Sequence, residues 1–257
     1  MAAERNTATH VVLALAAGGT AVATAYHDLT FGGGKLMSWL WLDLGWSEGI
    51  AESVVGTLAW VGLAAALALW FRGTRAARIA ACYLGLWIGL QAIAAMVADP
   101  VHAWRIPAAQ ATRYLTPIAL LLLWRPSRRG ATALLRVAAA ATFLAHGLEA
   151  LQHEAAFVDY LIIAGRDLLG TEPTIDAVHD TLFAIGIVDL AVAVAILSTR
   201  WRAVALYMAF WGLITAASRI VHSGGGAWHA AALRLPNAGV PLALWLLFRD
   251  SVPENQR

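Results

Sequence analysis

Three residues near the middle of the chain could do chemistry together: His146, Glu149 and His153, in the apolar sequence ATFLAHGLEALQHEAAF. Their spacing of i, i+3 and i+7 predicts one helical stripe, two turns long, that faces the interior of a helix bundle. A carboxylate can fix the tautomer of an imidazole and raise its basicity, and such pairs also build proton paths in membranes. The three residues are therefore candidate catalytic groups. A structural hydrogen-bond network between helices is the alternative.

Further polar residues follow at a similar depth of the expected bundle. Arg219 precedes His222 by one helical turn, so the two side chains should point the same way. Arg219 could neutralise Glu149 or Asp189, attract an anionic group, or extend outward to lipid headgroups. The candidate cofactor-binding residues are His179, Asp180, Asp189, Arg219, His222 and His229.

Histidine and carboxylate side chains together suit zinc, iron or copper. Two histidines on facing helices could instead hold haem iron, and a neutral imidazole can also hydrogen-bond a quinone carbonyl. The cofactor predicted from these residues is a transition metal, haem or a quinone. The predicted metal ligands are His146, Glu149, His153, His179 and His222.

The composition places these residues in a membrane. Sixty per cent of the residues are hydrophobic and 13% are charged, and the mean hydropathy is +0.66, which is too apolar for a soluble domain of 257 residues. We expect an all-α polytopic membrane protein with eight transmembrane helices, because apolar stretches long enough to cross the bilayer occur eight times. They cover about residues 10–26, 51–71, 79–98, 108–124, 132–151, 177–197, 203–221 and 232–248.

The chain also repeats itself, since residues 43–125 align with 167–249 at an offset of 124. Before that stretch the offset is 126, which places His27-Asp28 on His153-Glu154 as two copies of an interfacial anchor or a loop clamp. Two parallel four-helix modules are predicted, residues 1–126 and 127–257. Matched residues include Gly62/Gly186, Trp87/Trp211, Trp104/Trp228, Pro117/Pro241 and Arg125/Arg249.

The first module is interpreted as diverged scaffold and the second as the module that carries the site. At the repeat offsets, His146 and Glu149 stand opposite Thr20 and Ala23, and Asp189 stands opposite Ala65. The candidate polar residues are therefore confined to the second copy. Pro117 and Pro241 suggest a kink that both copies share.

The distribution of arginine predicts the orientation. One side of the eight-span arrangement receives twelve of the 18 cationic residues, and the positive-inside rule makes that side cytoplasmic. Both termini are then cytoplasmic, whereas the histidine-rich site and the long loops at 27–50 and 152–176 face outward. We expect a multi-pass protein of the inner or plasma membrane that does not bind nucleic acid. The twelve are Arg5, Arg72, Arg75, Arg78, Arg125, Arg128, Arg129, Arg136, Arg200, Arg202, Arg249 and Arg257.

Small residues give two further indications. Cys82 is the sole cysteine, so an internal disulfide and a CxxC redox pair are excluded. Gly85 and Gly89 form a GxxxG motif, which favours close helix contact within the first module.

At ATFLAHG, and in its four-helix modules with a large loop after the first span, the chain resembles the DoxX-like membrane proteins. That family includes the membrane subunit of thiosulfate:quinone oxidoreductases, so the resemblance implies a helical bundle linked to quinone or thiol redox chemistry. His146-Gly147 is the position to which the family motif applies. Thr20-Ala21 stands at this position in the first module. The chain has one cysteine, whereas thiol relay chemistry requires two.

The sequence therefore predicts a membrane redox-associated protein, an oxidoreductase or its quinone-binding subunit. It would bind a quinone-like lipid, a metal or haem near the outer leaflet, through histidines and carboxylates of the second module. Its expected partners are the lipid bilayer, a small hydrophobic ligand and subunits of a membrane complex. Two alternatives are a proton-coupled transporter or permease, and a non-catalytic subunit of a larger complex.

Overall fold

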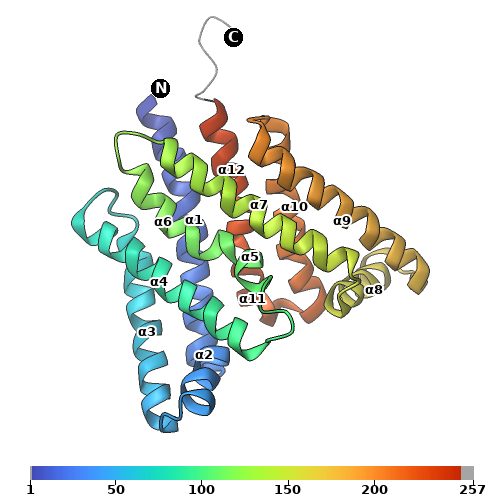
Figure 1. The fold of residues 1–257 in the computed structure, drawn as a ribbon, viewed down its shortest axis with the longest axis horizontal. Coiled ribbons are helices and arrows are strands. Elements are labelled where there is room, and N and C mark those ends of the chain that lie inside the picture. Colours follow the sequence, from blue (N-terminus) through green and yellow to red (C-terminus); the bar gives the residue numbers. More distant parts are fainter. Residues whose placement is uncertain (1, 250–257) are drawn as a thin grey trace, which may run out of the picture.

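The computed structural model describes residues 2–249, and it describes side chains from residue 7 onward. Arg5 and Arg257, two of the predicted cytoplasmic arginines, lie outside the residues whose side chains are described. Helices and the turns between them make up residues 2–249, with no strand in that range (Figure 1). The first half contains α1 Ala2–Thr30, α2 Gly34–Ser38, the π-helix η1 Trp39–Asp43, α3 Glu48–Ala68, α4 Arg75–Ala98, α5 Ile106–Ala109 and α6 Ala111–Leu123. The second half contains α7 Arg129–Leu151, α8 Ala155–Leu169, α9 Ile175–Ser198, α10 Arg202–Ser223, the 3-10 helix η2 Gly225–Ala227, α11 Trp228–Ala232 and α12 Leu235–Arg249.

Local sequence explains where several helices begin and end. Alanine and leucine dominate the long helices, and both have high helix propensity. Thr74 and Thr174 stand just before α4 and α9, and each side-chain oxygen accepts a hydrogen bond from the backbone three residues later. Gly170 ends α8 with a φ of 67°, the left-handed conformation that glycine adopts without steric cost.

Six helices of the described chain are long and apolar enough to span a membrane: Thr7–Thr30 within α1, α3, α4, α7, α9 and α10. A seventh span is possible if the pair Gly225–Ala232 and Leu235–Arg249, bent by 48°, is counted as one. The fourth expected span, at about 108–124, is shorter than expected, because α6 has 13 residues and extends about 20 Å at 1.5 Å per residue. Pro117 and Pro241 lie inside α6 and α12, whereas the 48° bend falls at the break before α12.

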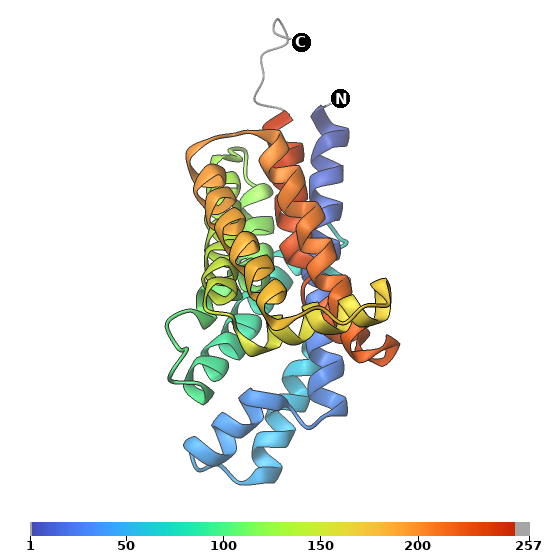
Figure 2. The same ribbon diagram turned by 90° about the vertical axis from the view of Figure 1, so that its right-hand side faces the viewer.

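The two longest segments expected to be loops are partly helical. The 27–50 segment contains α2 and η1, and the 152–176 segment contains α8. In α8 the apolar residues Phe157, Leu161 and Leu168 recur at helical spacing, which gives the helix one side that can pack. It packs across α9 and α10, as Figure 2 shows from the side.

Small residues allow the helices to approach closely. α1 packs against α3, α6 and α12, while α7 packs against α6, α9 and α12. The buried core between them is rich in alanine and leucine. Gly85 faces the Ile118 side chain of α6, so the predicted GxxxG contact within the first module is confirmed on the Gly85 side.

The arginine-rich turns gather at one end of the bundle. α1 begins and α12 ends at the same end of the molecule (Figure 1). Arg72, after α3, donates to Thr7 of α1 at 3.2 Å, and Trp124, after α6, donates to His10 at 3.3 Å. Arg136 donates from α7 to the last carbonyl groups of α9, at 2.7 Å to Ile196 O.

Candidate functional site

A cavity of about 330 Å³ lies in the second half of the chain, enclosed by α7, α8, α9, α10 and the start of α12. Its walls are mainly aliphatic and aromatic, and a few polar side chains interrupt them. This volume lies within the range that small-molecule sites occupy. The lining residues include Phe143, His146, Phe157, Tyr160, Leu161, Ala164, Leu182, Ile185, Asp189, Trp211, Thr215, Ser218, Arg219, Arg234 and Asn237.

His146 and Glu149 form a close pair at this cavity. His146 Nδ1 lies 2.7 Å from Glu149 Oε2, and the imidazole ring faces Phe157 with 6.0 Å between ring centroids. Because a carboxylate accepts hydrogen bonds, the Nδ1–H group donates and Nε2 is left for another partner. The pairing expected from the i, i+3 spacing is present.

Arg105 holds the other side of Glu149. It is 3% exposed, and its Nε lies 3.9 Å from Glu149 Oε1. Its terminal nitrogens donate to Gln152 Oε1 at 2.6 Å and to Glu154 Oε2 at 2.7 Å. One guanidinium therefore ties the end of α7 and the start of α8 to the segment that precedes α5.

The turn that leads to Arg105 is itself ordered. The backbone N–H of His102 donates to Asp99 Oδ1 at 3.2 Å, and His102 Nδ1 lies 3.1 Å from both carboxyl oxygens. This hydrogen bond from the His102 side chain lowers the pKa of the exposed Asp99 carboxyl group.

A close helix crossing places His146 and Asp189 on adjacent walls. A methyl group at Gly147 would lie 3.1 Å from Gly186 O and 3.2 Å from Asp189 Cβ. The α7 and α9 backbones can therefore approach only because both positions are glycine. His146 is adjacent to this crossing in sequence, which explains why a His-Gly step suits the position.

Asp189 is buried without a full set of partners. It is 4% exposed, Trp211 is the side chain that donates toward its carboxyl group, and Oδ1 has no hydrogen-bond partner. A buried polar atom without a partner costs free energy. Asp189 thus contributes to the cavity wall a buried oxygen that no neighbouring donor satisfies.

Arg219 also lies in the cavity wall. It is 7% exposed, and its guanidinium carbon stands 3.7 Å from the centroid of the Tyr160 ring. The side chain is thus buried in the protein and does not extend to lipid headgroups. His222 meets the same ring edge-on at 4.8 Å, as expected for two residues one turn apart.

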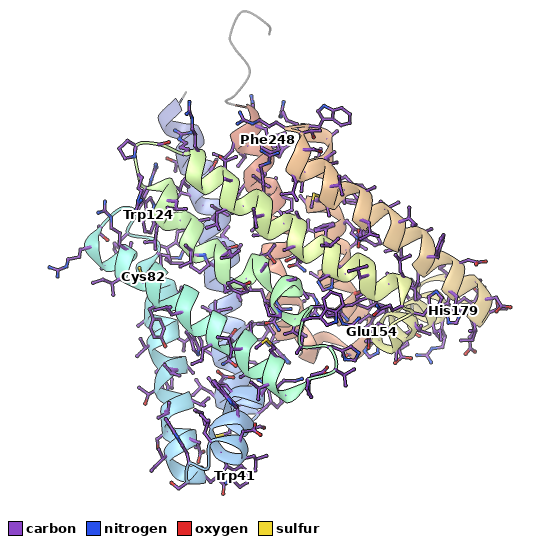
Figure 3. All side chains as sticks on the ribbon, in the orientation of Figure 1. Trp41, Cys82, Trp124, Glu154, His179 and Phe248 are labelled. Atoms are coloured by element: carbon purple, nitrogen blue, oxygen red, sulfur yellow. The ribbon has the colours of Figure 1, made fainter. Side chains whose placement is uncertain are left out.

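His153 leaves the predicted stripe. α7 ends at Leu151, and His153 has a φ of 51°, so the helical spacing from Glu149 does not continue. Its ring instead stacks on that of His179, 4.1 Å away and 3° from parallel. Glu154 and His179 are labelled on the same side of the molecule in Figure 3, between the levels of Phe248 and Trp41.

The other candidates lie outside the cavity. Asp180 is exposed on α9, and His222 Nδ1 lies 2.8 Å from Ser223 Oγ. His229 packs among aromatic rings at the end of α1. Its ring centroid lies 5.4 Å from that of Tyr26 and 6.0 Å from that of His27.

The five predicted metal ligands do not form one cluster. Within residues 2–249, no group of three or more histidine, cysteine, aspartate or glutamate side chains is placed to hold a metal ion. The physical reason is the turn after Leu151, which separates His153 from His146. A stacked pair such as His153 and His179 also differs from two imidazole nitrogens directed at one haem iron.

Comparisons with protein-family models, curated proteins and solved structures found no match to this chain.

The site contains residues that the sequence analysis did not select. Tyr160, Trp211 and Arg234 line the cavity, and Arg105 supports it from outside. The helical spacing of apolar residues in 155–169 is a signal that could have found α8. Arg105 lies more than 40 positions from its partners, and a single sequence carries no signal for that contact.

Proposed function

We propose that this protein crosses the membrane eight times as two four-helix modules, residues 1–126 and 127–257. In each module the fourth crossing would be a bent pair, α5 with α6 and α11 with α12. Two observations support this: each half has the same order of long and short helices, and the first helix of each half packs against the last helix of the other.

We propose further that the arginine-rich end faces the cytoplasm, so the cavity opens toward the outer leaflet. The support is the gathering of the turns that contain Arg72, Arg125 and Arg200 near the start of α1 and the end of α12, together with the positive-inside rule.

For the activity, we propose that the cavity binds a quinone-like lipid and that the protein is a membrane redox protein or its quinone-binding subunit. The observation that carries this proposal is the cavity itself: apolar walls of ligand size with a few convergent polar groups. The apolar tail would lie against Leu161, Leu182 and Ile185, and the polar head would reach His146.

His146 and Glu149 have defined roles in this proposal. Glu149 fixes the tautomer of His146, so Nε2 can hydrogen-bond the head of the ligand. Arg105 keeps Glu149 in place. Reduction of a quinone to a quinol takes up two electrons and two protons: a partner reductant would supply the electrons, the His146–Glu149 pair a route for one proton, and water the other.

Equilibrium binding of a short-tailed benzoquinone to the protein in lipid nanodiscs tests the proposal. We expect His146→Ala to weaken binding about tenfold, because it removes a hydrogen bond of about 1.5 kcal/mol to the ligand head. Glu149→Gln should weaken binding by a smaller factor, because the neutral amide holds the His146 tautomer less firmly than a carboxylate does. His179→Ala is the matched control, since His179 lies outside the cavity. Binding that is absent in the unchanged protein, or equal in all variants, would refute the proposal.

A further inference from the structure

Three arginines from three different elements lie close enough for their charges to influence one another, and two of them line the cavity. Arg219 comes from α10, Arg234 from the break between α11 and α12, and Arg113 from α6. The charges of Arg113 and Arg234 act on Arg219, and Glu149 is the acid whose charge acts on all three. Arg219 and Arg234 line the cavity directly.

None of the three arginines forms an ion pair within the described part of the chain. Arg234 donates to the backbone oxygen of Ala230 at 2.9 Å, and Arg219 lies over the Tyr160 ring. The Nε atoms of Arg113 and Arg219 are buried and have no hydrogen-bond partner. A guanidinium offers five donors in a fixed plane, so most of this donor capacity is unused.

The surrounding acids do not balance this charge. Glu149 is already engaged by His146 and Arg105. Asp189 is held from the Trp211 side and is not among the groups that act on these arginines. Glu149 is therefore the acid that acts on all three guanidinium groups, and it is shared with His146 and Arg105. Charges held inside a membrane protein are costly unless something pairs with them.

The arginines are carried by other elements than His146 and Asp189. His146 and Asp189 belong to the tightly crossed helices α7 and α9. Arg219 belongs to α10, and Arg234 directly precedes α12. Both side chains line the cavity and can reach a ligand in it.

We propose that the cavity takes an anionic amphiphile, a single apolar tail ending in a carboxylate or phosphate group that Arg219 and Arg234 bind. This inference rests on the proposed function only in needing the cavity to be a ligand site, and it adds a ligand class with a negatively charged head to the uncharged quinone. Arginine suits that head because it can donate two parallel hydrogen bonds to carboxylate or phosphate oxygens.

The test uses the full-length protein in zwitterionic nanodiscs and radiolabelled dodecanoate as the probe. Unlabelled dodecanoate, dodecyl phosphate and neutral dodecanol compete at equal membrane mole fractions. We expect both acids to compete at least tenfold better than dodecanol, in keeping with about 1.5–3 kcal/mol for hydrogen bonds to charged groups. Better competition by the carboxylate or by the phosphate identifies which head the site prefers, and either result supports the proposal.

Two variants and a control separate charge from folding. Arg219→Gln should reduce dodecanoate affinity about tenfold and leave dodecanol unchanged, while Arg219→Lys keeps the charge and should retain part of the affinity. Arg166→Gln is the control, because Arg166 is exposed and pairs with Asp167 outside the cavity. If Arg219→Gln lowers the melting temperature markedly, Arg234→Gln provides the same measurement from the other side of the cluster.

The outcomes also distinguish this inference from the proposed function. Ala164→Phe fills the cavity and should abolish binding of both dodecanoate and the benzoquinone. If dodecanol competes as well as dodecanoate and Ala164→Phe still abolishes benzoquinone binding, the anionic ligand is overturned and the cavity remains a ligand site. If Ala164→Phe changes binding of neither probe, both proposals fail.

Discussion

Arg105 joins two parts of the chain that are far apart in sequence. It lies directly before α5 and binds Gln152 and Glu154 at the turn between α7 and α8. The same side chain approaches Glu149, which holds His146. A residue of the first half thereby positions the polar pair of the second half.

Replacing this arginine should be costly. Arg105→Ala leaves two acids without their cation, and we expect a loss of about 2–3 kcal/mol, below the full range for a buried pair because Glu154 is partly exposed. Equilibrium unfolding in mixed micelles measures the change. Arg166→Ala, which breaks an exposed ion pair, should leave the unfolding midpoint unchanged. Equal effects of both variants would contradict the role assigned to Arg105.

His153 shows why part of the candidate site could not be read from the sequence. The spacing of His146, Glu149 and His153 is helical, but α7 ends two residues before His153 without a proline or glycine to mark the end. The His146–Glu149 pair depends on local spacing alone and was predictable. The turn after α7 brings His153 onto His179. The sequence around this turn contains no residue that would have predicted it.

Because His153 lies in a turn outside the cavity, two substitutions at this position should have contrasting effects. His153→Asn should keep benzoquinone binding unchanged, because the residue is not in the cavity wall and asparagine tolerates its φ of 51°. His153→Val should destabilise the protein by about 1–2 kcal/mol, since a β-branched residue is strained there. Binding titrations and unfolding curves of both variants check this. Loss of binding in a folded His153→Asn protein would show that His153 takes part in ligand binding.

At the scale of elements, the crossing of α7 and α9 builds two walls of the cavity. A methyl group at Gly186 would lie 2.7 Å from Leu151 Cγ and 2.8 Å from Gly147 O. A backbone oxygen cannot move aside without moving its helix. The sequence marks both glycines: Gly186 matches Gly62 in the repeat, and Gly147 belongs to the His-Gly step. It does not show that the two glycines meet at one helix crossing.

Gly186→Ala should therefore force the two helices apart and cost about 1–3 kcal/mol, the usual range for overpacking. It should also weaken benzoquinone binding, because His146 and Asp189 would separate. Gly56→Ala in α3 is the matched control: nothing lies within 4 Å of a methyl group there, and alanine should stabilise the helix by about 0.5–1 kcal/mol. Thermal unfolding in nanodiscs compares the two, and a stabilising Gly186→Ala would contradict the close crossing.

The helix α8 was the largest omission among the elements. The 152–176 segment lies between two long apolar runs and is predicted to be a loop, yet Phe157, Tyr160 and Leu161 recur at helical spacing and line the cavity. Membrane spans are recognised by long apolar runs, and a short amphipathic helix does not produce one. The long helices were therefore predictable, whereas the helix that covers the cavity was not.

At the scale of the whole molecule, the repeat and the packing give a consistent account of one contact. At offset 124, Arg105 corresponds to His229. Arg105 binds the residues after α7, and His229 packs against Tyr26 and His27 near the end of α1. In the proposed two-module arrangement the two contacts occupy equivalent positions. The contact of Arg105 consists of charged and polar groups, whereas that of His229 consists of aromatic rings, and the contact of Arg105 is the one beside the cavity.

The proposed orientation can be tested by cysteine labelling, because Cys82 is the single native cysteine and can be removed by one substitution. In a Cys82→Ala background, cysteines are placed at exposed positions of the turns: Ser47 and Glu172 at one end, Ala76 and Ser127 at the other. A membrane-impermeant maleimide added to intact cells should label the first two. The other two should react only after permeabilisation, because the arginine-rich turns stay in the cytoplasm. The reverse pattern would place the cavity at the inner leaflet, and labelling of Ser47→Cys and Ser127→Cys from the same side would exclude the eight-span arrangement.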